Sequence, residues 1–235
     1  MVIKKYSFFL IVCFCLDSCT ANVIREKQTN TSEHTSLQEI KKLYPVYSSL
    51  DAEVLIKGRA EKNVFSYNGK ISIEQGGNPA SYKFQLVVRD LVFFSPLVTI
   101  TINNDNLTWV DHLNNQSRNI KYINSSIIFF SRQQLASWVL IPLLTGNLPE
   151  VLIKNGKITD AGLRYSSPEY EIIGNFQDSK LTTLIYNPAE SYNQVIYTLS
   201  GSIKNSLSRH FPENIKIQLA EDDYIDIIYQ KIILK

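Results

Sequence analysis

Few residues of this sequence are arranged for catalysis or for metal binding. The three histidines (His34, His112 and His210) lie far apart in polar segments, and no two have the spacing of metal ligands. No serine stands in the Gly-x-Ser-x-Gly turn that activates a nucleophile. The acidic run Glu221-Asp222-Asp223 could hold a cation, but a solvated turn explains it better, because turns favour Asp. The sequence therefore predicts that the chain is not an enzyme and that it has no cofactor and no metal site.

The cysteines are the remaining candidates for covalent chemistry, and all three lie within the first nineteen residues. Lys4 and Lys5 precede the apolar run 6–16, a pattern typical of a secretory signal. That run is too short for a membrane-spanning helix, which needs about 20 residues. It ends in Leu16-Asp17-Ser18-Cys19, which is similar to the bacterial lipobox, although Asp17 replaces the usual small residue. We expect a lipoprotein signal peptide at 1–18 and lipidation of Cys19; the alternatives are an uncleaved anchor or a plain signal peptide.

The remaining chain is predicted to be a flexible tether followed by one domain. Residues 19–35 are polar and lack periodicity, as expected of a tether. Residues 36–235 contain no cysteine, so a disulfide framework and a Cys-based metal site are excluded. About 200 residues suffice for one domain with a large core. A net charge of +2 gives no electrostatic case for a nucleic-acid partner.

Alternation of apolar and polar residues dominates this domain. In 51–60, for example, Ala52, Val54 and Ile56 share one face while Glu53 and Lys57 share the other. This period of two is typical of half-buried antiparallel strands. It recurs in segments separated by short turns, so that we expect about ten strands, at 51–60, 65–74, 81–89, 98–102, 107–111, 170–176, 181–186, 195–199, 215–219 and 224–234.

Two segments have helical spacing instead. Residues 36–44 carry an N-cap candidate and end before Pro45, and residues 131–144 begin at Ser131 and end near Gly146. Pro142 should kink or stop the second helix at Ile141. This helix is apolar on every side after Leu140, so it is not a surface helix. We therefore predict a mainly β fold, an antiparallel open half-barrel with a helical lid or plug. A closed barrel filled by its own side chains is the alternative, and it leaves residues 138–144 without an obvious place.

The order of several short motifs resembles the lipoprotein-sorting fold of the LolA carrier and the LolB receptor, and the related DUF4292 lipoproteins. The resemblance covers nearly all of the mature domain. It rests on the strand Leu50–Gly58, the segment Ser95-Pro96-Leu97, the helix Leu135–Leu140 with Leu148-Pro149 after it, and the closing segment Phe211–Ile215. Val98 stands where the family usually has Gly.

The resemblance implies a monomeric LolB-like receptor, anchored by lipid in the outer membrane and facing the periplasm. Such a protein takes acyl chains of lipoproteins from a LolA-like carrier into an apolar cavity and helps to insert them into the membrane. The expected cavity and lid residues are Tyr82, Phe84, Leu86, Ile100, Ile102, Leu135, Trp138 and Val139. The alternative is a surface or periplasmic lipoprotein that binds another protein or lipids in general. An empty apolar cavity would favour the first function, and a filled interior with an exposed patch would favour the second.

A receptor of this kind also needs a way to touch the bilayer. The segment 91–97 carries Phe93, Phe94 and Leu97 around Ser95-Pro96, and Pro96 disfavours regular strand pairing. We expect these three residues to form a membrane-insertion loop. An ordinary buried strand at 91–94 is the alternative, because a short apolar run is ambiguous by itself.

Overall fold

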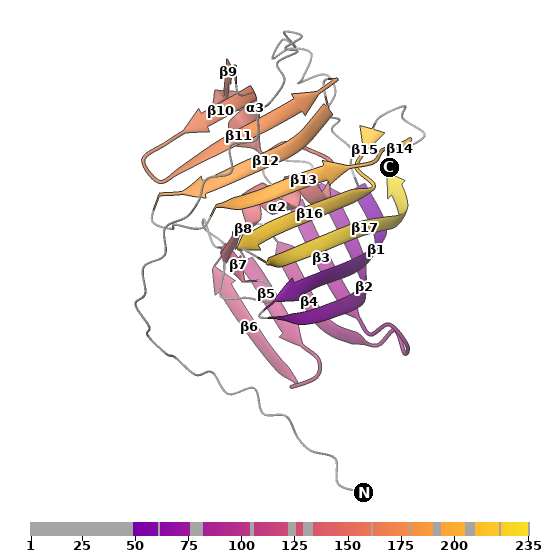
Figure 1. Ribbon diagram of the computed structural model, residues 1–235. Helices are drawn as coiled ribbons and strands as arrows, with labels where there is room; N and C mark the ends of the chain where they lie inside the picture. The colour runs from indigo at the N-terminus through magenta and orange to yellow at the C-terminus, as the bar shows by residue number, and fades with distance from the viewer. Residues whose placement is uncertain are drawn as a thin grey trace, which may run out of the picture. The chain divides into compact units, whose positions relative to one another are not determined.

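One antiparallel sheet of thirteen strands dominates the computed structural model of this chain (Figure 1). The structure describes residues 49–60, 62–75, 82–103, 106–121, 126–128, 134–160, 162–178, 180–189, 194–204, 210–220 and 222–234. All of them belong to one unit, His34–Lys235. The predicted signal peptide 1–18, Cys19, the tether 19–35 and the helix 36–44 lie outside the described residues.

The strands follow each other across the sheet in a simple pattern. In order they are β6 (Gln116–Lys121), β5 (Asn106–Asp111), β4 (Pro96–Asn103), β3 (Tyr82–Arg89), β2 (Asn63–Gln75), β1 (Ser49–Ala60), β17 (Asp223–Leu234), β16 (Asn214–Ala220), β13 (Val195–Ser200), β12 (Lys180–Pro188), β11 (Tyr170–Gln177), β10 (Gly162–Ser166) and β9 (Lys157–Thr159). Two small sheets pair β7 (Ser126–Ile128) with β8 (Gln134–Ala136) and β14 (Ile203–Lys204) with β15 (His210–Phe211). The large sheet begins at β6 and ends at β9 without pairing them, so it is open, as predicted.

Pairing of β1 with β17 joins the two halves of the sheet. These strands run antiparallel from Leu50 opposite Leu234 to Arg59 opposite Tyr224, with a bulge at Glu53/Val54. One half, β1 to β6, is a plain meander of neighbours, and the other runs from β17 to β9. The first and last strands of the described chain therefore lie at the middle of the sheet.

Alternating burial along the long strands shows that one face of the sheet is the core. In β1, Leu50, Ala52 and Val54 are buried while Glu53 and Lys57 are exposed. All ten predicted strands are confirmed within a few residues at their ends. The sequence analysis missed the short strands β6 to β10, β14 and β15, which have two to six residues each and little apolar alternation.

Two short helices are present in the described part of the chain, and the first corrects two expectations. Helix α2 spans Ser137–Leu144 and includes Pro142, so the predicted stop at Ile141 is wrong. Pro142 is the sixth residue of this short helix, and its missing N–H removes only one hydrogen bond, the one to the Trp138 carbonyl. The predicted helical start is also wrong, because residues 134–136 form β8; Ser131 itself lies outside the described residues.

Helix α2 is buried on nearly every side, as its sequence predicted. Val139, Leu140, Leu143 and Leu144 are each at most 2% exposed. Figure 1 shows the sheet curving around this helix. Helix α3 (Glu150–Asn155) follows and buries Leu152. Neither helix is long and apolar enough to cross a membrane within the part of the chain that is described.

Candidate functional site: an apolar interior and an exposed apolar loop

The inner face of β3 and β4 is built from the residues that the sequence analysis placed in a cavity. Phe84 lies opposite Ile102, and Leu86 lies opposite Ile100. All four side chains are at most 4% exposed. Cross-strand neighbours of this kind lie within about 5.5 Å of each other, so they form one continuous apolar surface. The side chain of Tyr82 lies outside the described part of the structure.

The helical residues of the same prediction meet this surface. Leu135, just before α2, and Val139, within it, are fully buried. Trp138 is half-buried and contacts the other half of the sheet. The structure therefore brings the described members of the predicted set into a single core, with Trp138 at its margin.

A small apolar cavity lies between α2 and the sheet. Its volume is about 20 Å³, which is room for about one water molecule, and no polar atom lines it. Its walls come from β1 to β3 (Ile56, Ile71, Leu86, Val88), from β8 and α2 (Leu135, Leu140, Leu144) and from β16 and β17 (Ile217, Ile225, Ile227). Leu86 and Leu135 are the predicted residues among them. The other wall residues on strands belong to the alternating apolar faces, so the alternation in the sequence could have identified them.

Among the contacts that hold α2 against the sheet, one lies at each end of the helix. At the N-terminal end, the Trp138 ring lies 4.8 Å from the Tyr170 ring and 5.8 Å from the Tyr186 ring, measured between centroids. At the C-terminal end, the Tyr229 hydroxyl donates a 2.8 Å hydrogen bond to the Leu144 carbonyl. The cavity beneath the helix is too small for an acyl chain, so a chain would enter this space only if α2 moved.

The aromatic contact at the first end is part of a larger group, which we call the tyrosine cluster (Trp138, Tyr165, Tyr170, Tyr186). The Tyr170 ring lies 5.8 Å from that of Tyr165 and 5.9 Å from that of Tyr186. All four side chains are half-buried. Burial raises the pKa of Tyr170, and the neighbouring Tyr165 raises it further. The raised pKa keeps Tyr170 neutral at physiological pH, and the four rings form an amphipathic margin of the core.

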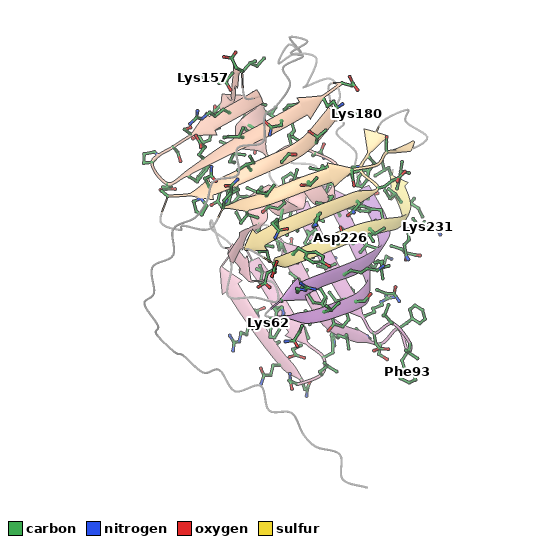
Figure 2. The ribbon with its side chains drawn as sticks, in the orientation of Figure 1. Lys62, Phe93, Lys157, Lys180, Asp226 and Lys231 are labelled. Atoms are coloured by element: carbon green, nitrogen blue, oxygen red, sulfur yellow. The ribbon has the colours of Figure 1, made fainter. Side chains whose placement is uncertain are left out.

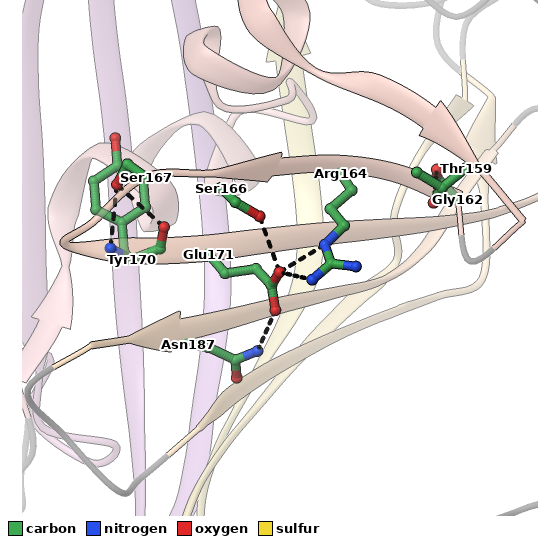
Figure 3. A network of polar contacts seen from close by, with 8 residues as sticks. All are labelled: Thr159, Gly162, Arg164, Ser166, Ser167, Tyr170, Glu171 and Asn187. Carbon is green, nitrogen blue, oxygen red and sulfur yellow. Dashed lines mark hydrogen bonds and ion pairs between the residues drawn. The ribbon is translucent and has the colours of Figure 1, made fainter.

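A polar network on the opposite face ties the strands beneath this cluster together (Figure 3). Arg164 Nε donates to Glu171 at 2.6 Å, Ser166 donates at 3.0 Å, and the Asn187 amide donates at 3.3 Å. Burial would raise the pKa of Glu171, but these hydrogen bonds, led by that from Arg164, outweigh it and lower the pKa. The carboxylate is held by β10, β11 and β12, so its role is to fix these strands.

The second candidate feature is the turn between β3 and β4. Leu91, Val92, Phe93 and Phe94 are 43%, 72%, 81% and 60% exposed. Figure 2 shows Phe93 projecting from the end of this hairpin. The alternative of a buried strand at 91–94 is therefore wrong. Leu97 belongs to β4 and is half-buried, so the tip of the loop consists of 91–94 and excludes the predicted Leu97.

Asp90, the residue that precedes the loop, holds the loop in shape. The Asp90 carboxylate accepts hydrogen bonds from the backbone N–H groups of Val92 (2.7 Å) and Phe93 (2.8 Å). The N–H of Asp90 donates to the Ser95 carbonyl at 3.0 Å. Phe94 takes a left-handed φ of 54°, which is unfavourable for a bulky side chain. A strained loop that exposes two phenylalanines is typical of a surface that contacts a membrane or another protein.

The neighbouring turn between β5 and β6 repeats this design and was missed from the sequence. Leu113 is 73% exposed, and the Asp111 carboxylate accepts from the N–H groups of Leu113 (2.9 Å) and Asn114 (3.1 Å). The His112 N–H donates to the Leu97 carbonyl, which fixes the two turns at the same end of the sheet. A lone leucine in a polar turn, two residues after Asp111, was the available signal.

Among the three histidines, the structure describes the side chain of His112. His112 is exposed, and its Nε2 lies 2.9 Å from the Thr99 hydroxyl. No group of three or more His, Cys, Asp or Glu among the described residues could hold a metal ion. Glu221 and the side chain of His210 lie outside the described part of the structure.

Comparison with known proteins identifies the fold. No protein-family profile and no curated protein matches the sequence. A DUF1329 family protein from Desulfovibrio piger is similar in structure, with a TM-score of 0.60 and 10% identity, over 85% of this chain and 90% of that one. A domain from Vibrio parahaemolyticus, provisionally described as an outer-membrane lipoprotein-sorting protein, has a TM-score of 0.57 and 7% identity, over 84% and 90% of the two chains. The chain shares the fold of these two proteins. The sequence resemblance had predicted a fold of the lipoprotein-sorting type, in agreement with the second of them.

A LolA superfamily protein from Nitrosomonas europaea aligns with 10% identity over 85% of this chain and 91% of its own, at a TM-score of 0.43. The features of this chain that matter here are its open sheet, the helix within the curve of the sheet and the apolar cavity between them.

Proposed function

We propose that this chain is a lipoprotein, anchored through Cys19 in the outer membrane, that binds acyl chains of other lipoproteins beneath α2 and helps to insert them into that membrane. In this proposal it faces the periplasm, receives its cargo from a LolA-like carrier and has no catalytic activity. The likeness in fold to a domain assigned to lipoprotein sorting supports the proposal.

The observation that carries it is the position of α2. A helix that is apolar except for Ser137 fills the curve of an open sheet, and an aromatic contact and a hydrogen bond connect its two ends to that sheet. Each methylene of an acyl chain that replaced the helix against this surface would contribute about 0.8 kcal/mol. Sixteen-carbon chains could therefore offset the loss of the contacts of α2 without specific polar recognition.

The exposed loop 91–94 supplies the second half of the proposal. Exposed phenylalanine side chains are unfavourable in water, and their transfer into the interface of a bilayer lowers the free energy. We propose that Val92, Phe93 and Phe94 touch the membrane, with Leu113 beside them, while the cargo leaves the interior.

Trp138 offers a direct test, because it lies on the helix that must move. Trp109 on β5 is the second tryptophan, and Trp109→Phe leaves Trp138 as the sole indole. Adding a palmitoylated peptide to this variant should change the emission of Trp138 as it leaves Tyr170 and Tyr186. The same peptide without the palmitoyl group is the control. An unchanged spectrum at saturating acylated peptide, with no displacement of an apolar dye, would refute acyl-chain binding.

The small volume of the cavity favours a second candidate. A filled interior and an exposed apolar loop also suit a lipoprotein that docks another protein through residues 91–94. In that case the variant Phe93→Glu would abolish binding of the partner, and acylated peptides would leave Trp138 unaffected.

A further inference from the structure

Three buried side-chain oxygens among the described residues lack a hydrogen-bond partner, on Asn214, Asp226 and Tyr197, and of these residues Tyr197 belongs to the hydrophobic core. The side chain of Tyr197 on β13 is fully buried, and its hydroxyl has no hydrogen-bond partner among the described residues. Burial raises the pKa of Tyr197 far above its ordinary value, so the group remains a neutral O–H donor. A buried donor without an acceptor is costly and calls for an explanation.

The register of the sheet places Tyr197 beside the apolar cavity. It lies directly opposite Ile217, which lines the cavity, and opposite the fully buried Leu184 on its other side. Opposed residues of adjacent strands lie within about 5.5 Å of each other. Tyr197 therefore places a polar side chain next to the cavity wall, on the side toward β12.

Beyond Tyr197, the same inner face reaches the tyrosine cluster. Tyr186 occupies the diagonal position on β12, two residues from Leu184, and it contributes to the raised pKa of Tyr197. Tyr170 and Trp138 then lead to the half-exposed margin. The order along this face is an aliphatic cavity, one buried hydroxyl and a set of amphipathic rings.

This order matches the order of groups in an acylated amphiphile: a hydrocarbon chain, one carbonyl and a polar end. We propose that the Tyr197 hydroxyl donates a hydrogen bond to the ester or amide carbonyl of a bound acyl group. The chain then lies in the apolar interior and the polar end lies beside Tyr170 and Tyr186. This inference rests on the proposed function and adds to it the orientation of the ligand and the requirement for a carbonyl.

A pair of lysolipids tests the contribution of the carbonyl group to binding. Palmitoyl lysophosphatidylcholine and hexadecyl lysophosphatidylcholine differ in having an ester or an ether link to the chain. Each is used below its critical micelle concentration to displace diphenylhexatriene, a hydrocarbon dye without hydrogen-bonding groups, from the purified full chain. One hydrogen bond predicts displacement by the ester at a concentration about tenfold lower than by the ether. In Tyr197→Phe, the two lysolipids should become equivalent.

The matched control is Tyr224→Phe, which removes the same atom from β17 on the outer face, where Lys216 covers the ring. This variant should keep the preference for the ester. Equal displacement by the two lysolipids in the unmodified chain, or a preference that persists in Tyr197→Phe, would overturn the carbonyl site while leaving acyl-chain binding intact. Failure of both lysolipids to displace the dye would refute acyl-chain binding as well.

Thermal unfolding gives an independent result without ligand. Because the hydroxyl lacks a partner in the free protein, Tyr197→Phe should raise the melting temperature, and Tyr224→Phe should leave it unchanged. A lower melting temperature for Tyr197→Phe would mean that the hydroxyl is already hydrogen-bonded, and it would overturn the proposal.

Discussion

The Tyr229 hydroxyl donates a 2.8 Å hydrogen bond to the carbonyl of Leu144, the last residue of α2, from a position 85 residues further along the chain. The bond is buried, and the Phe211 ring packs edge-on against Tyr229 at 4.9 Å. It connects the helix that closes the interior to β17, at the middle of the sheet.

Tyr229→Phe tests this attachment. The variant keeps the ring and its packing but leaves the Leu144 carbonyl without this donor, so the free energy of unfolding should fall by about 1–2 kcal/mol. Urea denaturation measures this change. If α2 is a movable lid, the same variant should bind an apolar dye faster, since one fastening of the helix is lost. A loss of stability with an unchanged rate of dye binding would argue against opening at this end.

Phe93→Glu tests the exposed loop. Phe93 is 81% exposed and makes no core contact, so the free energy of unfolding should change by less than about 0.5 kcal/mol. Transfer of acylated cargo from the protein into liposomes should be strongly reduced, because a carboxylate does not enter the bilayer interface. Val64→Glu is the matched control, since Val64 is 72% exposed on β2, outside the loop. Equal transfer by Phe93→Glu and the unmodified chain would remove the loop from the delivery step.

Leu113→Glu asks whether the second turn takes part. Leu113 is 73% exposed next to the loop, so this variant should also fold normally. We expect a smaller loss of transfer than for Phe93→Glu, because the leucine side chain has less apolar area than the phenylalanine side chain. An effect no larger than that of Val64→Glu would restrict membrane contact to the β3–β4 turn.

The conformation of the loop 91–94 should also depend on pH, through the ionisation of Asp90. Hydrogen bonds from the N–H groups of Phe93 and Val92 lower the pKa of Asp90 below its ordinary value of 3.8. A carboxyl whose pKa is lower in the folded state stabilises that state above the unfolded pKa, and this contribution is lost as the pH falls through the folded pKa. The loop should therefore be intact at neutral pH and lose its order only below about pH 3.8. The amide chemical shifts of Val92 and Phe93 should titrate with a midpoint below 3.8, and a midpoint above it would contradict the turn.

Cys19→Ala tests the anchor, which the sequence alone predicts. Cells fed a fatty-acid analogue should label the unmodified chain and leave the variant unlabelled. The variant should also leave the membrane fraction or keep its signal peptide. Persistent labelling would refute lipidation at Cys19, and recovery of the unmodified chain only in the inner membrane would refute the proposed location.

The sequence by itself determined the strands and the sets of side chains that lie together. Alternation is a local property, because successive residues of a strand point to opposite faces whatever the strand pairs with. Ala52, Val54 and Ile56 therefore shared a face before any partner was known, and the apolar run of α2 had to be buried. The resemblance in motif order supplied the architecture that periodicity left open.

Tertiary structure alone decided the pairing of β1 with β17, the exposure of 91–94 and the surroundings of Tyr197. The pairing joins Leu50 to Leu234, and no local pattern specifies partners that far apart. Four consecutive apolar residues fit a buried strand as well as a loop, and here the Asp90 turn and the end of β3 decide between them. The isolation of the Tyr197 hydroxyl depends on what β12, β16 and α2 place around it. Local sequence specifies which side chains lie together, whereas their solvation depends on contacts between segments distant along the chain.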